Sequence, residues 1–248
     1  MQRARRRWRI SAPASELSPS RLERDDPMSW IQFLPALLKG AEVTAVIAVV
    51  STLLGAAMAF IIGIARVEGG PILSRIALFY IEFMRGVPLL VKFFWLYYAL
   101  PLIGLSLDPI TTGIAGLVLN ISAYGAEVVR GGLQSVPDQQ HEAARALNFS
   151  KSYTLVHICL PQALVEMMPA FGNLAVQNLK DTALVSLISI TDLTFQAQQL
   201  RNITLNSTRV FTLTLIGYFA MALALAMVMR LIEHRLRRGA AFPKVAHG

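Results

Sequence analysis

The sequence contains a single cysteine and few charged residues for its length. Cys159 stands alone among 248 residues, so no disulfide can form within the chain. Only 15% of the residues are charged whereas 54% are hydrophobic, and the mean hydropathy is +0.52. A soluble domain carries roughly 25% charged residues. The shortage of charge therefore argues against a soluble protein and favours a membrane protein.

The sequence also lacks the glycine-rich loop with which many ATPases hold phosphate. No glycine lies between Gly132 and Gly172, so the pair Lys151-Ser152 cannot belong to a G-x-x-x-x-G-K-[ST] motif. The histidines are scattered without metal-ligand spacing, at His141, His157, His234 and His247. We therefore expect no catalytic residue, no metal site and no cofactor, and the chain is not expected to hydrolyse ATP.

What the chain has instead is a set of long apolar stretches. Residues 43–65, 109–126 and 210–229 carry no charge, and each can cross a hydrocarbon layer about 30 Å thick at ~1.5 Å per helical residue. Two more stretches, 76–105 and 161–190, are apolar but interrupted by charge. Continuous rather than alternating hydrophobicity favours helices over a barrel. We predict an all-α integral membrane protein with five main transmembrane helices, at about 41–65, 76–104, 109–130, 161–190 and 209–232.

Lysine and arginine are spread unequally between the two sides of these spans. The side richer in these residues faces the cytoplasm in membrane proteins. The connections 66–75 and 131–160 and a C-terminal tail, 239–248, are therefore expected inside. The net charge of +8 largely reflects this bias, so nucleic acid is not expected as a partner. The cytoplasmic set is Arg66, Arg75, Arg130, Arg145, Lys151, Arg230, Arg235, Arg237, Arg238 and Lys244, against Lys39, Arg201 and Arg209 on the other side.

Residues 1–27 do not fit this distribution, because "MQRARRRWRI" is basic yet precedes the outer end of the first span. The segment lacks the apolar stretch of a secretory signal. It is either a basic tail on the membrane surface or a stretch upstream of a true start at Met28. In both cases we expect residues 1–27 to be poorly ordered.

The 131–160 connection is long and carries helix signals of its own. Pro137 marks a helix start that Ser135 can cap. Ser150 can cap a second short helix, and Pro161 marks the start of the next span. A short helix at the cytoplasmic mouth can dock into a groove of a partner or pack only on its own bundle, and these residues leave both readings open.

The text "EAARALNFS…ICLPQA" resembles the EAA loop of ABC importer permeases, which reads E-A-A-x-x-x-G followed by I-x-L-P. The resemblance implies a MetI-like permease fold over residues 28–238 and a cytoplasmic helix that couples to a separate ATP-binding cassette subunit. In that family Glu142 would be the charged contact, with Arg145 and Ala146 on the docking face. The matching residues are Glu142, Ala143, Ala144, Ile158, Leu160 and Pro161.

Asn148 stands where that pattern has glycine. A glycine just beyond a helix end usually adopts left-handed geometry, and asparagine is the next best residue there. We predict a positive φ at Asn148 and little loss of coupling.

Three further stretches, "YIEFMRGVPLLVKFFWLYYALP", "LNISAYGAEVVRGGLQSVP" and "NLKDTALVSLISITDLTFQAQQL", resemble the polar amino-acid subgroup of these permeases. "EAARALN", residues 94–107 and "DLTFQAQQLR" are most similar to permeases of ectoine and hydroxyectoine importers. The resemblance implies import of a zwitterionic amino-acid-like solute across the bacterial inner membrane. It also implies a second, different permease chain and an extracytoplasmic solute-binding protein that meets the 191–208 and 101–108 loops.

Ionisable side chains at bilayer depth cost about 2.5–3.5 kcal/mol each on insertion scales, so they are candidates for function. Glu82 and Arg85 are three residues apart and can pair, and Gly86 and Pro88 would bend the helix after them. Either Arg85 meets a solute carboxylate, or the pair only fixes the bend. Lys92 is expected near the outer end with its ammonium group snorkelling to the surface.

Polar side chains also follow helical spacing on spans three and four. They can supply a zwitterion with donors, a carboxylate and an aromatic face, or they can simply form interhelical hydrogen bonds. Glu127 and Arg130 are expected to pair at the inner end of span three. The tentative solute-pathway residues are Glu82, Arg85, Asn120, Tyr124, Asn173, Gln177, Lys180 and Asp181.

Two other classes of membrane protein fit less well. An ion-coupled secondary transporter would need coupling carboxylates near the midplane and usually more spans. Five spans, and a coupling loop that has no role in such a transporter, argue against it. The other alternative is a membrane scaffold or assembly factor.

Overall fold

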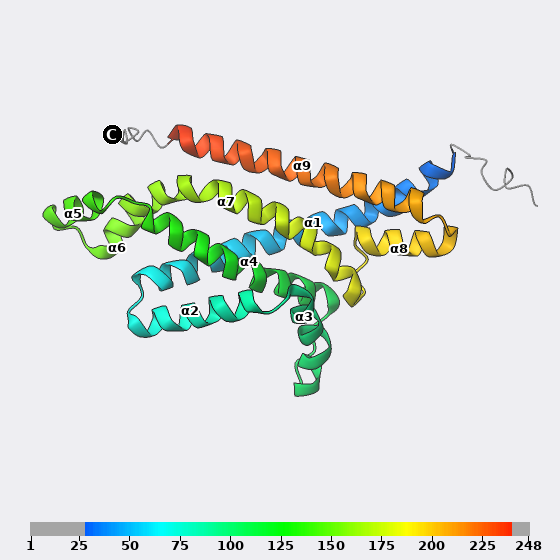
Figure 1. The fold of residues 1–248 in the computed structure, drawn as a ribbon, viewed down its shortest axis with the longest axis horizontal. Helices are drawn as coiled ribbons and strands as arrows, with labels where there is room; N and C mark the ends of the chain where they lie inside the picture. The colour runs from blue at the N-terminus through cyan, green and yellow to red at the C-terminus, as the bar shows by residue number, and fades with distance from the viewer. Residues whose placement is uncertain (1–27, 240–248) are drawn as a thin grey trace, which may run out of the picture.

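Long helices that run side by side make up the fold (Figure 1). The computed structural model describes residues 28–239, and the predictions made for residues 1–27 and for the tail beyond 239 lie outside this range. The described residues form helices and no strand, which confirms the all-α prediction. The helices are α1 (Met28–Glu68), α2 (Pro71–Gly86), α3 (Leu89–Phe94), α4 (Pro109–Gln134), α5 (Asp138–Ala146), α6 (Lys151–Thr154), α7 (Leu160–Asp181), α8 (Leu193–Thr204) and α9 (Ser207–Gly239).

The five predicted spans are present, four as long helices and one as a bent pair. The long helices cover Gln32–Glu68, Pro109–Gln134, Lys151–Ile188 and Ser207–Arg238. Span two is α2 followed by Leu89–Ile103, which meet at an angle of 100°. Pro88 restricts Val87 to an extended backbone, and the helix cannot continue through them. The predicted break after Gly86 is confirmed, but span two is not one straight helix.

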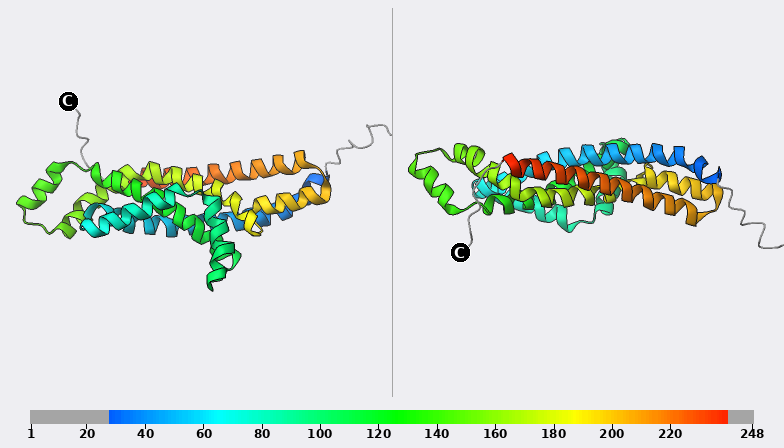
Figure 2. Two further views of the ribbon diagram at one scale, coloured as in Figure 1. Left: turned by 60° about the horizontal axis from the view of Figure 1, so that its bottom comes forward. Right: turned by 90° about the horizontal axis from the view of Figure 1, so that it is seen from above.

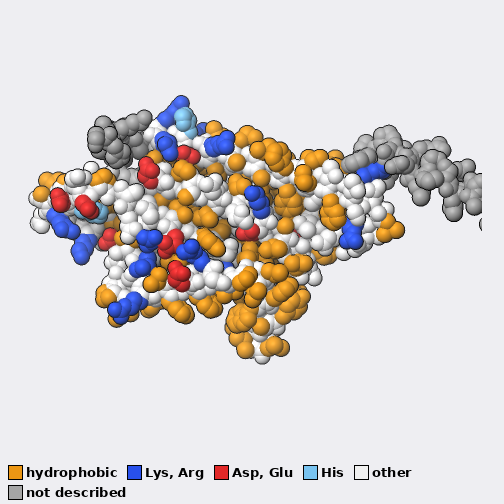
Figure 3. Space-filling view, in the orientation of Figure 1, with side chains coloured by type: hydrophobic (Ala, Val, Ile, Leu, Met, Phe, Trp, Pro, Cys, Tyr) orange, Lys and Arg blue, Asp and Glu red, His pale blue; other side chains and the backbone are white. Residues whose placement is uncertain are grey.

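The bend directs α3 and the turns that follow it out of the bundle. Figures 1 and 2 show this arm, Leu89–Ile103, leaving the parallel helices, and Figure 3 shows apolar side chains over its surface. Leu102 near its tip is 86% exposed. The arm therefore presents a largely apolar surface beside the main bundle.

The second helix of the 131–160 connection is continuous with the fourth span, so the prediction that this span starts at Pro161 is wrong. α6, a π-helical turn at Leu155–Cys159 and α7 form one rod that begins at Lys151. Proline lacks an N–H group, and its ring clashes with the carbonyl four residues earlier in a regular α-helix. The wider π turn directly before Pro161 relieves that clash, and the rod continues.

One end of the bundle carries the turn between α1 and α2, the α5–α6 hairpin and the last turns of α9, whereas α8 lies at the other end (Figure 1). Lysine and arginine gather over the first of these ends (Figure 3). The grouping agrees with the sidedness predicted from the sequence, which assigns this end to the cytoplasm.

Small residues let α1 and α4 pack closely. A Cβ added at Gly63 of α1 would lie 2.6 Å from the Cβ atom of Val129, and one added at Gly125 of α4 would lie 2.7 Å from the Cβ atom of Ala59. Close approach through small residues is a common way for helices to associate in a membrane. These positions fix the distance between the two helices that form the centre of the fold.

Asp192 fixes the corner between the fourth span and α8. Its buried carboxylate accepts hydrogen bonds from the backbone N–H groups of Thr194 (3.2 Å) and Phe195 (2.9 Å) and from the Tyr218 hydroxyl (3.1 Å). Burial raises the pKa of this carboxyl group, partly offset by these hydrogen bonds. A carboxyl group whose pKa is raised on folding contributes most to stability when protonated, and this contribution is lost as the pH rises through its folded pKa.

We expect Asp192→Ala to lower the free energy of unfolding by about 1–2 kcal/mol, because it removes a helix cap and leaves buried donors unpaired. Asp192→Asn keeps an accepting oxygen and should unfold near the wild-type temperature, with a weaker pH dependence. Thermal unfolding of the detergent-solubilised protein between pH 5 and 8 measures both effects. Equal melting temperatures for the alanine variant and the wild type would contradict this role of Asp192.

Candidate coupling helix and solute cavity

The predicted coupling helix α5 begins one residue later than expected. Pro137 is the residue before the helix rather than its first residue, and no side chain caps the N-terminus. The prediction that Ser135 caps it is wrong, because the Ser135 hydroxyl donates to the Gly132 carbonyl (2.8 Å) at the end of α4. The hydroxyl group therefore pairs with a backbone carbonyl of α4 and not with a backbone N–H group of α5.

The turn after α5 has the predicted geometry. Asn148 has a φ of +57°, its N–H group donates to Arg145 O (2.9 Å), and Phe149 N–H donates to Ala144 O (3.0 Å). Ser150 Oγ accepts from Tyr153 N–H (3.3 Å) and caps α6 as predicted. Asparagine thus does at this position what glycine does in the EAA pattern.

The residues expected to couple to a partner are divided between two faces of the hairpin. Ala144 is only 2% exposed and anchors α5 to its own protein. Glu142, Ala143 and Arg145 are exposed, as is Ala146 at the end of the helix. Pro161 lies apart from them, on α7. α5 therefore offers a charged and partly apolar face at the end of the bundle that the sequence assigns to the cytoplasm.

A second candidate site is a cavity of about 460 Å³ between the broken span, α4 and α7. Five of the predicted pathway residues line it: Arg85, Asn120, Tyr124, Gln177 and Asp181. The Arg85 guanidinium lies 5.4 Å from the centre of the Tyr124 ring, and Gln177 Nε2 donates to Asp181 Oδ1 (2.9 Å). The cavity thus combines a cation, a carboxylate, an aromatic face and amides.

Three predicted pathway residues do not line this cavity. Glu82 is 64% exposed and pairs with Arg85 at 3.8 Å, as predicted. Asn173 lines a separate groove beside α9, and Lys180 is exposed. An α-helix turns by 100° per residue, so Lys180 lies within about 20° of Asn173, whereas Gln177 and Asp181 are rotated about 40° and 80° from it. The predicted stripe of Asn173, Gln177 and Lys180 therefore splits, and only Gln177 faces the cavity.

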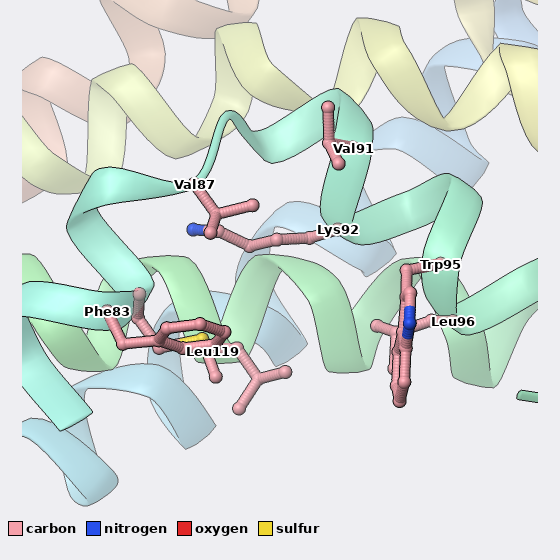
Figure 4. A pocket seen from close by; sticks show the side chains of 8 residues that line it. Phe83, Val87, Val91, Lys92, Trp95, Leu96 and Leu119 are labelled. Carbon is pink, nitrogen blue, oxygen red and sulfur yellow. The ribbon is translucent and has the colours of Figure 1, made fainter. Parts of the chain in front are cut away.

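Lys92 does not snorkel to the surface, contrary to the prediction. It is 6% exposed, and its Nζ atom donates to Asn120 Oδ1 (2.7 Å). Figure 4 shows its side chain running back along the bend rather than outward. The 100° turn after α2 aims this lysine toward α4 instead of outward. The one sequence signal for this residue is the free-energy cost of placing a charged side chain within an apolar span.

Asn178 was also missed. It lines the cavity, is 2% exposed and places Nδ2 near Ala48 O (3.2 Å), Ser51 Oγ (2.8 Å) and Thr52 Oγ1 (2.9 Å). Its Oδ1 atom is buried and has no hydrogen-bond partner among the described residues. Buried polar atoms without partners are rare in proteins, so this oxygen calls for an explanation.

The charged pair at the inner end of α4 forms as predicted. Arg130 Nη2 lies 2.8 Å from Glu127 Oε2, and Arg130 Nη1 donates to Gln134 Oε1 (2.6 Å). The pair lies where α4 leads into the hairpin and stiffens this end of the helix.

Comparison with known proteins agrees with this architecture. Residues 51–238 match the family of binding-protein-dependent transport system inner membrane components. The chain belongs to this family. It is therefore a multi-pass protein of the inner membrane, and this permease shares the fold that the EAA resemblance implied.

Relatives of this permease include amino-acid transport proteins. A probable amino-acid ABC transporter permease of Sinorhizobium fredii is 48% identical, over 85% of this chain and 91% of its own. The glutamine transport system permease of Escherichia coli is 32% identical, over 82% of this chain and 94% of its own. A crystal structure of an amino acid ABC transporter with histidines superposes with a TM-score of 0.78 at 31% identity, covering 84% of this chain and 97% of the other.

Proposed function

We propose that this permease is the translocation subunit of an ATP-driven importer for a zwitterionic, amino-acid-like solute. Ectoine or hydroxyectoine is the favoured solute, and the alternative is another polar amino acid such as glutamine, glutamate, a basic amino acid or an opine. The observation that carries the proposal is a cavity beside a broken span that holds a cation and a carboxylate together. Broken helices that line a polar path are typical of transported-solute sites.

In this proposal Arg85 receives the solute carboxylate and Asp181 receives its positive end. Glu82 holds Arg85 in place, and Tyr124 offers an aromatic face that suits a cation. Charge-assisted hydrogen bonds are roughly twice as strong as neutral ones, so a cavity lined by both a cation and a carboxylate favours a zwitterion over a neutral solute.

We propose that a separate ATP-binding cassette subunit docks on the exposed face of α5. Glu142, Ala143, Arg145 and Ala146 would contact it, with Ala144 and the Asn148 turn holding α5 in position. The continuous rod from Lys151 then gives a mechanical path from the hairpin into the fourth span. ATP binding by that partner would rock this permease and a second, different permease chain between inward-facing and outward-facing states.

The proposed delivery partner is an extracytoplasmic solute-binding protein that meets the loops around residues 101–108 and 191–208. Residues 191–208, which include α8, lie at the end of the bundle opposite the α5–α6 hairpin, whereas the 101–108 loop follows the arm that projects sideways from the bundle (Figure 2). The named relatives support an amino-acid solute, whereas ectoine rests on the resemblance of residues 94–107 and 192–201.

Uptake by a strain with and without the gene tests the solute. Labelled ectoine, glutamine, glutamate and arginine are supplied separately at the same low concentration. We expect ectoine uptake to fall at least tenfold in the deletion strain and to return with the plasmid-borne gene. Equal ectoine uptake with and without the gene would exclude ectoine, and a selective loss of glutamine uptake would favour the alternative. No change for any polar solute would contradict the importer proposal.

A further inference from the structure

We propose that Asn120 donates hydrogen bonds to one end of the solute and that Asn178 accepts a hydrogen bond from the other end. Lys92 is the positioning residue that fixes the orientation of the Asn120 amide. Asn120 presents N–H donors to a carboxylate, whereas Asn178 presents a carbonyl acceptor to an N–H group of the positive end. The inference rests on the proposed function and narrows the solute class. The solute must carry both a carboxylate and a cationic nitrogen that bears hydrogen.

The polarity of Asn120 follows from its partner. A lysine ammonium group can only donate hydrogen bonds, so the Asn120 atom 2.7 Å from Lys92 Nζ must be the oxygen. The amide nitrogen of Asn120 then points away from Lys92. Because Asn120 lines the cavity, its two N–H groups are available to an anionic group that enters.

The polarity of Asn178 is fixed in the opposite sense. The Ala48 carbonyl can only accept, and Ser51 already donates its single hydrogen to Ile47 O (2.7 Å). The Asn178 atom that faces these groups must therefore be the nitrogen. Its oxygen is buried and has no hydrogen-bond partner among the described residues, and Asn178 is a residue that lines the cavity. A solute N–H group would satisfy it.

Lys92 lies at the boundary between two cavities. Its side chain lines a cavity of about 450 Å³ inside the bend, together with Phe83 and Trp95 (Figure 4), and its nitrogen donates to Asn120. Val87 and Asn120 also line the solute cavity. No ion pair of Lys92 forms among the described residues, so the hydrogen bond to Asn120 is the polar contact that holds its buried ammonium group. A hydrophobic residue at position 92 would avoid the free-energy cost of burying a charge. The presence of a lysine is explained by its ammonium group, which orients the Asn120 amide.

These two polarities predict which solutes are rejected. A site that hydrogen-bonds an N–H group discriminates strongly against an analogue that lacks it, because the site's own buried group stays unpaired. Amino acids and ectoine carry such N–H groups. A fully N-methylated betaine keeps both charges but has no N–H group, and it should bind far more weakly.

Solute binding to the purified complex of permease and ATPase, without the binding protein, tests the inference. The probes are labelled glutamine and labelled ectoine, each displaced by its own unlabelled form and by its fully N-methylated form. We expect the wild-type complex to bind one of the probes and to bind the N-methylated form at least tenfold more weakly.

Asn120→Asp is the sharpest variant, because it keeps the shape and strengthens the bond to Lys92 while replacing the donor with an acceptor. We expect a loss of solute affinity of at least tenfold, with assembly of the complex of permease and ATPase unchanged. Gln32→Glu, an amide-to-acid change at an exposed position of α1, should leave solute affinity unchanged. A role of Asn120 that is only structural would be preserved by aspartate.

Lys92→Met should allow the Asn120 amide to rotate by 180° and should weaken solute binding several-fold. Lys92→Arg keeps a hydrogen-bond donor at this position and should bind the solute with near wild-type affinity. Wild-type affinity in Asn120→Asp, or equal affinity for the N-methylated probe, would overturn the inference while leaving the importer intact. A wild-type complex that binds neither probe and transports no solute with ATP would instead overturn the proposed function.

Discussion

Glu142→Lys is expected to reduce ATP-driven uptake to less than a tenth of the wild-type rate and to release the ATPase subunit from the permease. Glu142 is exposed on α5, next to the exposed Ala143. Like charges brought together at an interface cost several kcal/mol, and each 1.4 kcal/mol lowers affinity tenfold. The reversed charge would meet the partner's complementary surface directly.

Co-purification of the tagged permease with its ATPase measures this effect, together with uptake in proteoliposomes. Glu42→Lys is the matched control, because Glu42 is also exposed but lies in the N-terminal half of α1, away from the α5–α6 hairpin. The control should retain the ATPase. If the Glu142 variant held as much ATPase as the control, α5 would not be the docking helix.

Gly63→Val is expected to destabilise the permease by about 3 kcal/mol, near the upper end for overpacking substitutions. An added Cβ would lie 2.6 Å from the Val129 Cβ atom and 2.9 Å from the Ala126 carbonyl oxygen. The carbonyl belongs to the backbone and cannot rotate away, so α1 and α4 must move apart. The yield of folded protein and the melting temperature should both fall sharply.

Gly131→Val provides the matched control within α4, because a Cβ at Gly131 meets nothing within 4 Å. The melting temperature of this variant should stay within a few degrees of the wild type. Similar melting temperatures for the two valine variants would show that close contact between α1 and α4 is not what limits stability.

Features with a local cause could be predicted from the sequence. The apolar stretches gave the spans because a membrane helix must satisfy its own backbone. Pro88 predicted the break in span two, and the place of Asn148 at the glycine position of the EAA pattern predicted its positive φ. Both effects act within a few residues along the chain.

Features that depend on tertiary direction could not be predicted. Lys92 is buried because a 100° bend turns its helix toward α4, and the sequence indicates the bend but not its direction. Asn178 is a recognition candidate because α1 binds its nitrogen while its buried oxygen has no hydrogen-bond partner among the described residues. This arrangement depends on the packing of two segments that are distant in the sequence. The fourth span continues through Pro161 because of a π-helical turn at Leu155–Cys159, and no sequence pattern predicts that turn.

The central claim is that ATP hydrolysis by a separate subunit drives solute through this permease. The most direct measurement is accumulation of labelled solute by proteoliposomes that contain the two permeases and the ATPase, with binding protein outside and ATP inside. We predict accumulation above the external concentration with ATP, and none without ATP or with Glu142→Lys. Accumulation driven by a proton or sodium gradient in the absence of ATP would contradict the claim.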